Sequence, residues 1–122
     1  MTLTNYEILV WAQNLSSFDF DEYLPVKVNF YLKKNMALVL DKASELDKER
    51  EKIVLQYGKI KDDGAIEFEN SEKELTANQE YTDLLTLAQD LDIIKIPLSN
   101  FENINMKTSQ LTAIMPMIEE DK

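Results

Sequence analysis

An uninterrupted stretch from Val26 to Tyr57 contains neither glycine nor proline, and it constrains the fold of this chain more than any other feature. Pro25 precedes the stretch and Gly58 follows it, as is favoured at the two ends of a helix. Apolar residues recur every seven positions within it: Leu32, Val39, Leu46 and Ile53. This spacing is typical of an amphipathic helix. We therefore predict one long helix over residues 26–57, roughly 45–50 Å in length at 1.5 Å per residue.

The apolar seam of this helix follows spacings of four and three residues: Leu32, Met36, Val39, Ala43, Leu46, Arg50, Ile53 and Tyr57. Other large apolar residues broaden the stripe in the first half, which we expect to be buried on more than one side: Phe30, Tyr31, Leu38 and Leu40. The second half is narrow and charged, which predicts an exposed arm that holds one partner along its seam. Arg50 in the seam argues against a strict coiled coil. We therefore predict a protein-binding surface made of Lys42, Leu46, Arg50, Ile53 and Tyr57.

A shorter helix is predicted before the long one. Thr4 and Glu7 have the spacing of a capping box, so we expect a helix over about residues 5–15. Trp11 falls on the apolar face of this helix and is expected in the core. An aromatic-rich connection over residues 18–24 then leads to the long helix.

A β-hairpin is predicted over about residues 59–69, after the long helix. A two-residue Asp63-Gly64 turn would pair Ile60 with Glu67 and put Ile60 and Ile66 on opposite faces, whereas a three-residue loop over residues 62–64 would pair Ile60 with Ile66. We favour the loop, with its glycine in the left-handed conformation, because it places Ile60 opposite Ile66 on one face. The β-branched segment 93–98 is a candidate third strand beside this hairpin.

Two further helices are predicted in the second half of the chain. One begins near residue 72 or 77, where capping boxes overlap, and carries an apolar stripe: Tyr81, Leu84, Leu85, Ala88 and Leu91. The last helix is capped by Thr108 or Ser109 and is kinked or ended by Pro116. Together these elements predict a mainly helical α+β fold in a single domain over residues 1–122, with one long helix, three shorter helices and a small antiparallel hairpin or sheet. The tail 119–122 is expected to be flexible.

The composition excludes several chemistries. The chain has no cysteine and no histidine, which removes thiolate catalysis, the commonest general base and the commonest metal ligands. Its net charge is −10, and residues 61–122, with fourteen acidic and five basic residues, contribute −9 of it. A negative field repels nucleic acids and anionic membranes, so we predict that the chain binds neither. A leader segment with a basic and then an apolar region is not expected at the start, which favours a cytoplasmic location.

The motifs that are present have structural interpretations. Gly58 and Gly64 are too few for a phosphate-binding loop. The Asp62-Asp63-Gly64 cluster lacks the ligand spacing of a calcium loop, because Lys59 occupies the position of the first ligand. Paired carboxylates are frequent in so acidic a chain. We therefore predict no catalytic residue, no cofactor and no metal site, and we expect that the protein is not an enzyme.

Several stretches together resemble small proteins of unknown function that are encoded by phages and prophages of Gram-positive bacteria: Leu24–Asn35, Tyr57-Gly58-Lys59 with Asp63-Gly64, and Ser109-Gln110-Leu111 with Met115–Glu120. The resemblance spans most of the chain. It implies a phage context, either in the cytoplasm of a bacterial host or in association with the virion. It implies no active-site residues in this chain.

Three functions follow as hypotheses. The first is a non-catalytic phage accessory protein that binds itself, a phage protein or a host protein through its long helix. The second is an acidic inhibitor that mimics nucleic acid and binds a basic host or defence protein. The third is a binder of a small nucleotide or metabolite, which requires a concave apolar pocket with a few polar groups.

Overall fold

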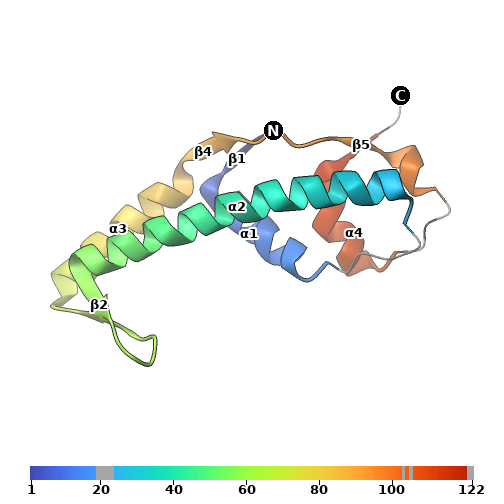
Figure 1. Ribbon diagram of the computed structural model, residues 1–122. Coiled ribbons are helices and arrows are strands. Elements are labelled where there is room, and N and C mark those ends of the chain that lie inside the picture. The colour runs from blue at the N-terminus through green and yellow to red at the C-terminus, as the bar shows by residue number, and fades with distance from the viewer. Residues whose placement is uncertain (19–23, 103, 105, 121–122) are drawn as a thin grey trace.

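The structure, a computed structural model, describes residues 1–18, 24–102, 104 and 106–120, and it confirms a mainly helical α+β fold built along one long helix (Figure 1). Within these ranges the helices are α1 Asn5–Ser16, α2 Val26–Tyr57, α3 Ser71–Thr86 and α4 Thr108–Ile114, with the 3₁₀ helices η1 Leu98–Phe101 and η2 Met115–Met117. The strands are β1 Thr2–Thr4, β2 Gly58–Ile60, β3 Ile66–Phe68, β4 Ala88–Asp90, β5 Ile96–Pro97 and β6 Ile118–Glu119. They pair two by two as β1–β4, β2–β3 and β5–β6.

Helix α1 begins at the predicted capping box. The Thr4 hydroxyl accepts a hydrogen bond from the Glu7 N–H at 3.1 Å, and the Glu7 carboxylate accepts one from the Thr4 N–H at 2.9 Å. The hydrogen bond from the Thr4 N–H favours the charged carboxylate and is the main cause that lowers the pKa of Glu7. Both bonds satisfy N–H groups that have no partner inside the helix.

Helix α2 has the bounds that the sequence predicts, because Pro25 precedes its first turn and Gly58 follows its last. Its buried face is Val28, Leu32, Asn35, Val39, Ala43, Leu46 and Val54. The first half of this face packs against α1 and forms the core of the fold together with buried residues of α4 and η2. The second half packs against α3 (Figure 1).

The core holds Trp11 as predicted. Its side chain is 5% exposed, and its indole N–H donates a hydrogen bond to the Ala113 carbonyl oxygen at 2.7 Å. This bond joins α1 to α4 across 102 residues of sequence. The predicted last helix is also confirmed, since α4 ends at Ile114 and Pro116 lies in η2.

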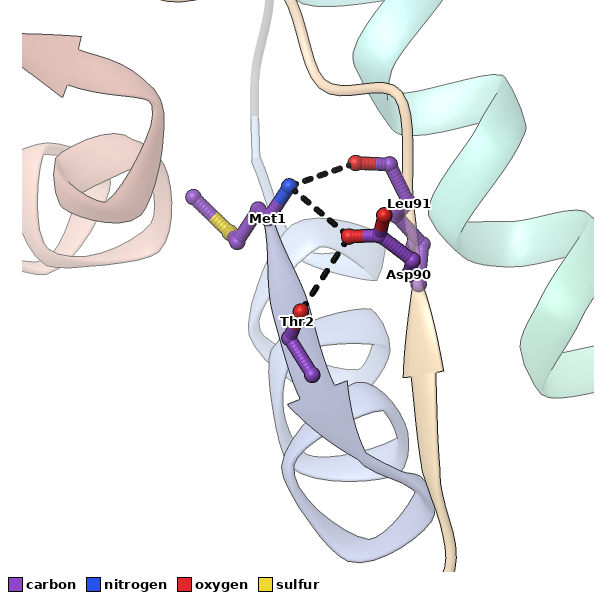
Figure 2. A network of polar contacts seen from close by, with 4 residues as sticks. All are labelled: Met1, Thr2, Asp90 and Leu91. Atoms are coloured by element: carbon purple, nitrogen blue, oxygen red, sulfur yellow. Dashed lines mark hydrogen bonds and ion pairs between the residues drawn. The ribbon is translucent and has the colours of Figure 1, made fainter.

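The first residues of the chain pair with β4, a contact that the sequence analysis missed. β1 and β4 run antiparallel, with Leu3 opposite Gln89. Figure 2 shows the Met1 ammonium group donating to the Leu91 carbonyl oxygen at 2.9 Å and lying 3.3 Å from the Asp90 carboxylate. The Thr2 hydroxyl donates to the same carboxylate at 3.2 Å. The predicted extension of the third helix to Ala88 and Leu91 is therefore wrong: α3 ends at Thr86, and the chain continues as β4.

The predicted third strand of the hairpin sheet is also wrong. Within segment 93–98, only Ile96 and Pro97 form a strand, and they pair in parallel with Ile118 and Glu119. Ile96 is fully buried in the core, which draws this segment away from the hairpin. Glu119, the first residue of the predicted flexible tail, pairs with Pro97 in β6, and residues 121–122 of that tail lie outside the described residues.

The β2–β3 hairpin projects from the far end of α2 (Figure 1). Ile60 pairs with Ile66, and Gly64 has a φ of 86°. The Gly64 N–H donates to the Lys61 carbonyl at 2.9 Å and closes the turn. The three-residue loop is thus confirmed. The following helix, α3, begins at Ser71, one residue before the earlier of the two predicted starts, and the Asn70 side chain caps it by accepting from the Lys73 N–H at 2.8 Å.

Candidate interaction surface

The residues predicted to bind another protein lie along the face of α2 that turns toward α3. Leu46 is buried and belongs to the core cluster, and Ile53 is half-buried. Lys42 is half-buried, and its ammonium group lies 3.5 Å from the Glu45 carboxylate on the same helix. The structure therefore fills much of the predicted seam with contacts inside the chain.

Arg50 and Tyr57 make direct contacts with α3. The Arg50 guanidinium lies over the Tyr81 ring, 5.8 Å from its centroid, which is the geometry of a cation–π contact. The Tyr57 hydroxyl donates a hydrogen bond to the Glu80 carboxylate at 2.6 Å. The second half of α2 thus packs against α3 of the same chain, and binding of another protein at this seam stays a prediction.

The contact with Glu80 makes the stability of the α2–α3 pair depend on pH. The hydrogen bond to Glu80 favours the protonated hydroxyl and raises the pKa of Tyr57 above its ordinary value near 10. The stabilisation is fully present below about pH 10 and is lost as the pH rises through the folded-state pKa. We expect Tyr57→Phe to lower the melting temperature at neutral pH, and we expect the difference from the wild type to shrink above pH 10. Thermal melts from pH 7 to 11 check this, with Tyr6→Phe, at an exposed tyrosine away from Glu80, as the control. A difference that stays constant across this range would contradict it.

The opposite side of α2 remains exposed along its whole length. Val26 is 87% exposed, Phe30 57% and Leu55 55%, and Ala37 and Leu40 are also exposed. At about 100° per residue, these five positions fall within an arc of about 80°, which also holds the exposed polar residues Lys33, Ser44, Lys48 and Glu51. We call this surface the outer stripe of α2: Val26, Phe30, Ala37, Leu40 and Leu55.

The prediction that the first half of α2 is buried on more than one side is therefore wrong. Phe30 and Leu40 are exposed, while Tyr31 and Leu38 are only half-buried. The physical reason is that α1 and the α4–η2 segment cover one side of the helix and supply no atoms to the other. Phe30 packs instead against its neighbours on the same helix, with its ring centroid 5.9 Å from that of Tyr31 in an edge-to-face arrangement.

Lysines flank the aromatic part of the outer stripe. The Lys34 ammonium group lies 5.6 Å from the centroid of Phe30, and that of Lys27 lies 5.9 Å from the centroid of Tyr31. Among the described residues, neither lysine forms an ion pair with a carboxylate. Residues 24–40 contain three lysines and no acidic residue, although the chain as a whole has a net charge of −10.

Two surface cavities are large enough for a small ligand. One of about 320 Å³ lies between α1 and the α4–η2 segment and is lined by Leu3, Tyr6, Glu7, Val10, Trp11, Asn14, Thr112 and Pro116. Another of about 380 Å³ lies at the base of the hairpin and is lined by Tyr57, Gly58, Lys59, Glu67, Phe68 and Glu69. The first is mostly apolar and the second carries both charges. Binding of a small nucleotide or metabolite stays a prediction.

Across residues 1–18, 24–102, 104 and 106–120, acidic side chains nowhere gather in a group of three or more that could hold a metal ion. In the same part of the chain, every helix is too short or too polar to cross a membrane.

Comparisons with known proteins do not add to these observations. No family model, curated protein or solved structure matches the chain.

Proposed function

We propose that this protein is a non-catalytic accessory protein that acts by binding another protein through the outer stripe of α2. The observation that carries the proposal is the exposure of Val26, Phe30 and Leu55 along one side of α2, whose opposite face is buried in the fold. Exposed apolar residues that occur singly need no explanation, but a row of them along one helix face is typical of an interaction site. A phage context is part of the proposal and is supported by the resemblance described above.

The sequence hypothesis placed the binding surface on the other side of the same helix, at Lys42, Leu46, Arg50, Ile53 and Tyr57. The contacts of Arg50 and Tyr57 with α3 leave that side less accessible than the outer stripe. The proposal therefore keeps α2 as the docking element and moves the surface to its exposed side.

A capture experiment tests the proposed function. The wild type and the double variant Val26→Ser/Phe30→Ser, both with a tag at the C-terminal end, are used to recover proteins from infected host cells in the presence of an untagged copy of the chain. We expect at least one protein, which can be the untagged copy, to be recovered about tenfold less by the double variant, because both changes remove apolar contact area from the stripe.

The matched control is Leu98→Ser, which changes an exposed leucine on η1, away from α2. The control should recover the same proteins as the wild type. Equal recovery of every protein by the double variant and the wild type would contradict the proposal.

A second candidate function is supported by the charge of residues 61–122, which is −9. The many exposed carboxylates of this half could bind the positively charged surface of a basic protein, as nucleic acid does. A partner of this kind would be recovered equally by the wild type and the double variant at low salt, and would be lost at high salt because exposed charges are screened.

A further inference from the structure

We infer that the cavity between α1 and the α4–η2 segment binds a small organic ammonium ion with an apolar body. The cavity has a volume of about 320 Å³, which lies at the lower end of the range for small-molecule sites. Its described lining residues belong to β1, α1, α4 and η2, and none of them belongs to α2. The inference therefore goes beyond the proposed function and does not depend on it.

One side of α1 forms the main wall of the cavity. Tyr6, Val10 and Asn14 follow one another at intervals of four residues, and Glu7 and Trp11 form a second row of the same spacing beside them. Residues at this spacing lie on one face of a helix. Two aromatic rings and a valine suit the apolar body of a ligand, and the face of an aromatic ring also attracts a cation.

Two of these side chains are held in place by hydrogen bonds within the fold. The indole N–H of Trp11 donates to the Ala113 carbonyl oxygen at 2.7 Å, so the ring is fixed between α1 and α4. The carboxylate of Glu7 accepts from the Thr4 N–H at 2.9 Å. Binding to groups that are already positioned costs less conformational entropy than binding to mobile ones.

The charge of the cavity favours a cationic ligand. Glu7 is ionised at neutral pH, and none of the described residues that line the cavity is basic. The Lys95 ammonium group donates to the Pro116 carbonyl oxygen at 2.8 Å, but Lys95 itself does not line the cavity. A carboxylate accepts several hydrogen bonds, so Glu7 can bind an ammonium group and keep its bond to Thr4. A phosphate or carboxylate ligand would instead meet a like charge.

Three phenyl compounds of similar size test this preference. At pH 7, 2-phenylethylamine is a cation, 2-phenylethanol is neutral and 3-phenylpropanoate is an anion. Their binding is followed by the fluorescence of Trp11, the only tryptophan of the chain. We expect the amine to bind with a Kd on the order of 1 mM, as for a small ligand in an open site. The alcohol should bind about threefold more weakly than the amine, because Glu7 is exposed and an exposed ion pair adds little affinity. The acid should bind more weakly still.

The variant Glu7→Gln separates the charge of the cavity from the stability of the helix. Glutamine at this position keeps the capping box, so the fold is preserved, as circular dichroism can check. The variant should bind the amine and the alcohol equally, with the affinity that the wild type has for the alcohol. Glu72→Gln, at an exposed acid in the first turn of α3, is the control for the net charge of −10 and should keep the preference for the amine.

A second variant tests the apolar wall. Val10 is 40% exposed, so Val10→Ala removes two methyl groups from the cavity with little effect on the core. It should weaken the binding of all three compounds by about threefold and leave their order unchanged. Leu98→Ala, at an exposed leucine on η1, is its control and should bind all three compounds like the wild type.

Two-dimensional ¹H–¹⁵N spectra locate the site. The indole N–H of Trp11 and the side-chain amide of Asn14 should shift when the amine is added. The backbone N–H groups of Gly58 and Lys59, which line the other cavity at the base of the hairpin, should stay in place.

Three results would overturn the inference: no saturable binding of the amine in the millimolar range, shifts that leave out Trp11 and Asn14, or a preference for the amine that survives in Glu7→Gln. Each of these results leaves the proposed function in place, because that function is tested by Val26→Ser/Phe30→Ser on α2. Equal recovery of all proteins by that double variant would in turn leave the cavity unaffected.

Discussion

Replacing Asn35 with alanine is expected to lower the free energy of unfolding by about 2–4 kcal/mol. Asn35 is 1% exposed in the middle of α2, and its side chain binds both backbone groups of Ile94. Its amide N–H donates to the Ile94 carbonyl at 2.8 Å, and its amide oxygen accepts from the Ile94 N–H at 2.8 Å. The change leaves both backbone groups without their partners and also creates a cavity beside the core.

Chemical denaturation of the wild type and the variant measures the effect. The matched control is Asn78→Ala, which changes an exposed asparagine inside α3 and should alter the free energy of unfolding by less than about 0.5 kcal/mol. If Asn35→Ala were no more destabilising than the control, the segment between β4 and β5 would not depend on Asn35 for its position.

Replacing Trp11 with alanine is expected to lower the free energy of unfolding by about 3–5 kcal/mol. The change removes a large buried ring from the junction of α1 and α4 and takes away the donor to the Ala113 carbonyl. Trp11→Phe separates the two contributions, because it keeps an aromatic ring and loses only the donor and part of the volume. We expect it to be intermediate.

Denaturation curves followed by circular dichroism check this prediction, since the variant loses the only tryptophan. Tyr6→Ala, at an exposed aromatic residue on the same helix, is the control and should have a small effect. A Trp11→Ala variant as stable as this control would show that α1 and α4 are held together by other contacts.

The elements that could be predicted from the sequence are those set by neighbouring residues. Pro25 and Gly58 bound α2, Thr4 and Glu7 cap α1, and Gly64 closes the hairpin loop, so each signal lies within a few residues of its effect. The β1–β4 and β5–β6 pairs have no such signal. Their strands are two or three residues long, too short for an alternating pattern, and their partners are far away in sequence.

The candidate surface shows a different limit of sequence reasoning. The seam on the second half of α2 packs against α3, and periodicity does not distinguish contact with a helix of the same chain from contact with another molecule. The exposure of Phe30 could not be predicted, because an aromatic residue near an apolar stripe is more often buried. Asn35 did have a signal, since it lies three residues after Leu32 and four before Val39, where a polar residue requires a buried partner.

The position of Met1 has a practical consequence for anyone who produces this protein. Its amino group is a charged donor that reaches both Leu91 and Asp90. A peptide fused ahead of it would turn that group into a neutral amide with a single hydrogen, and the added residues would start where β1 and β4 meet. An affinity handle at the other end of the chain avoids this region, and a comparison of the two fusions reports how strongly the first strand is held.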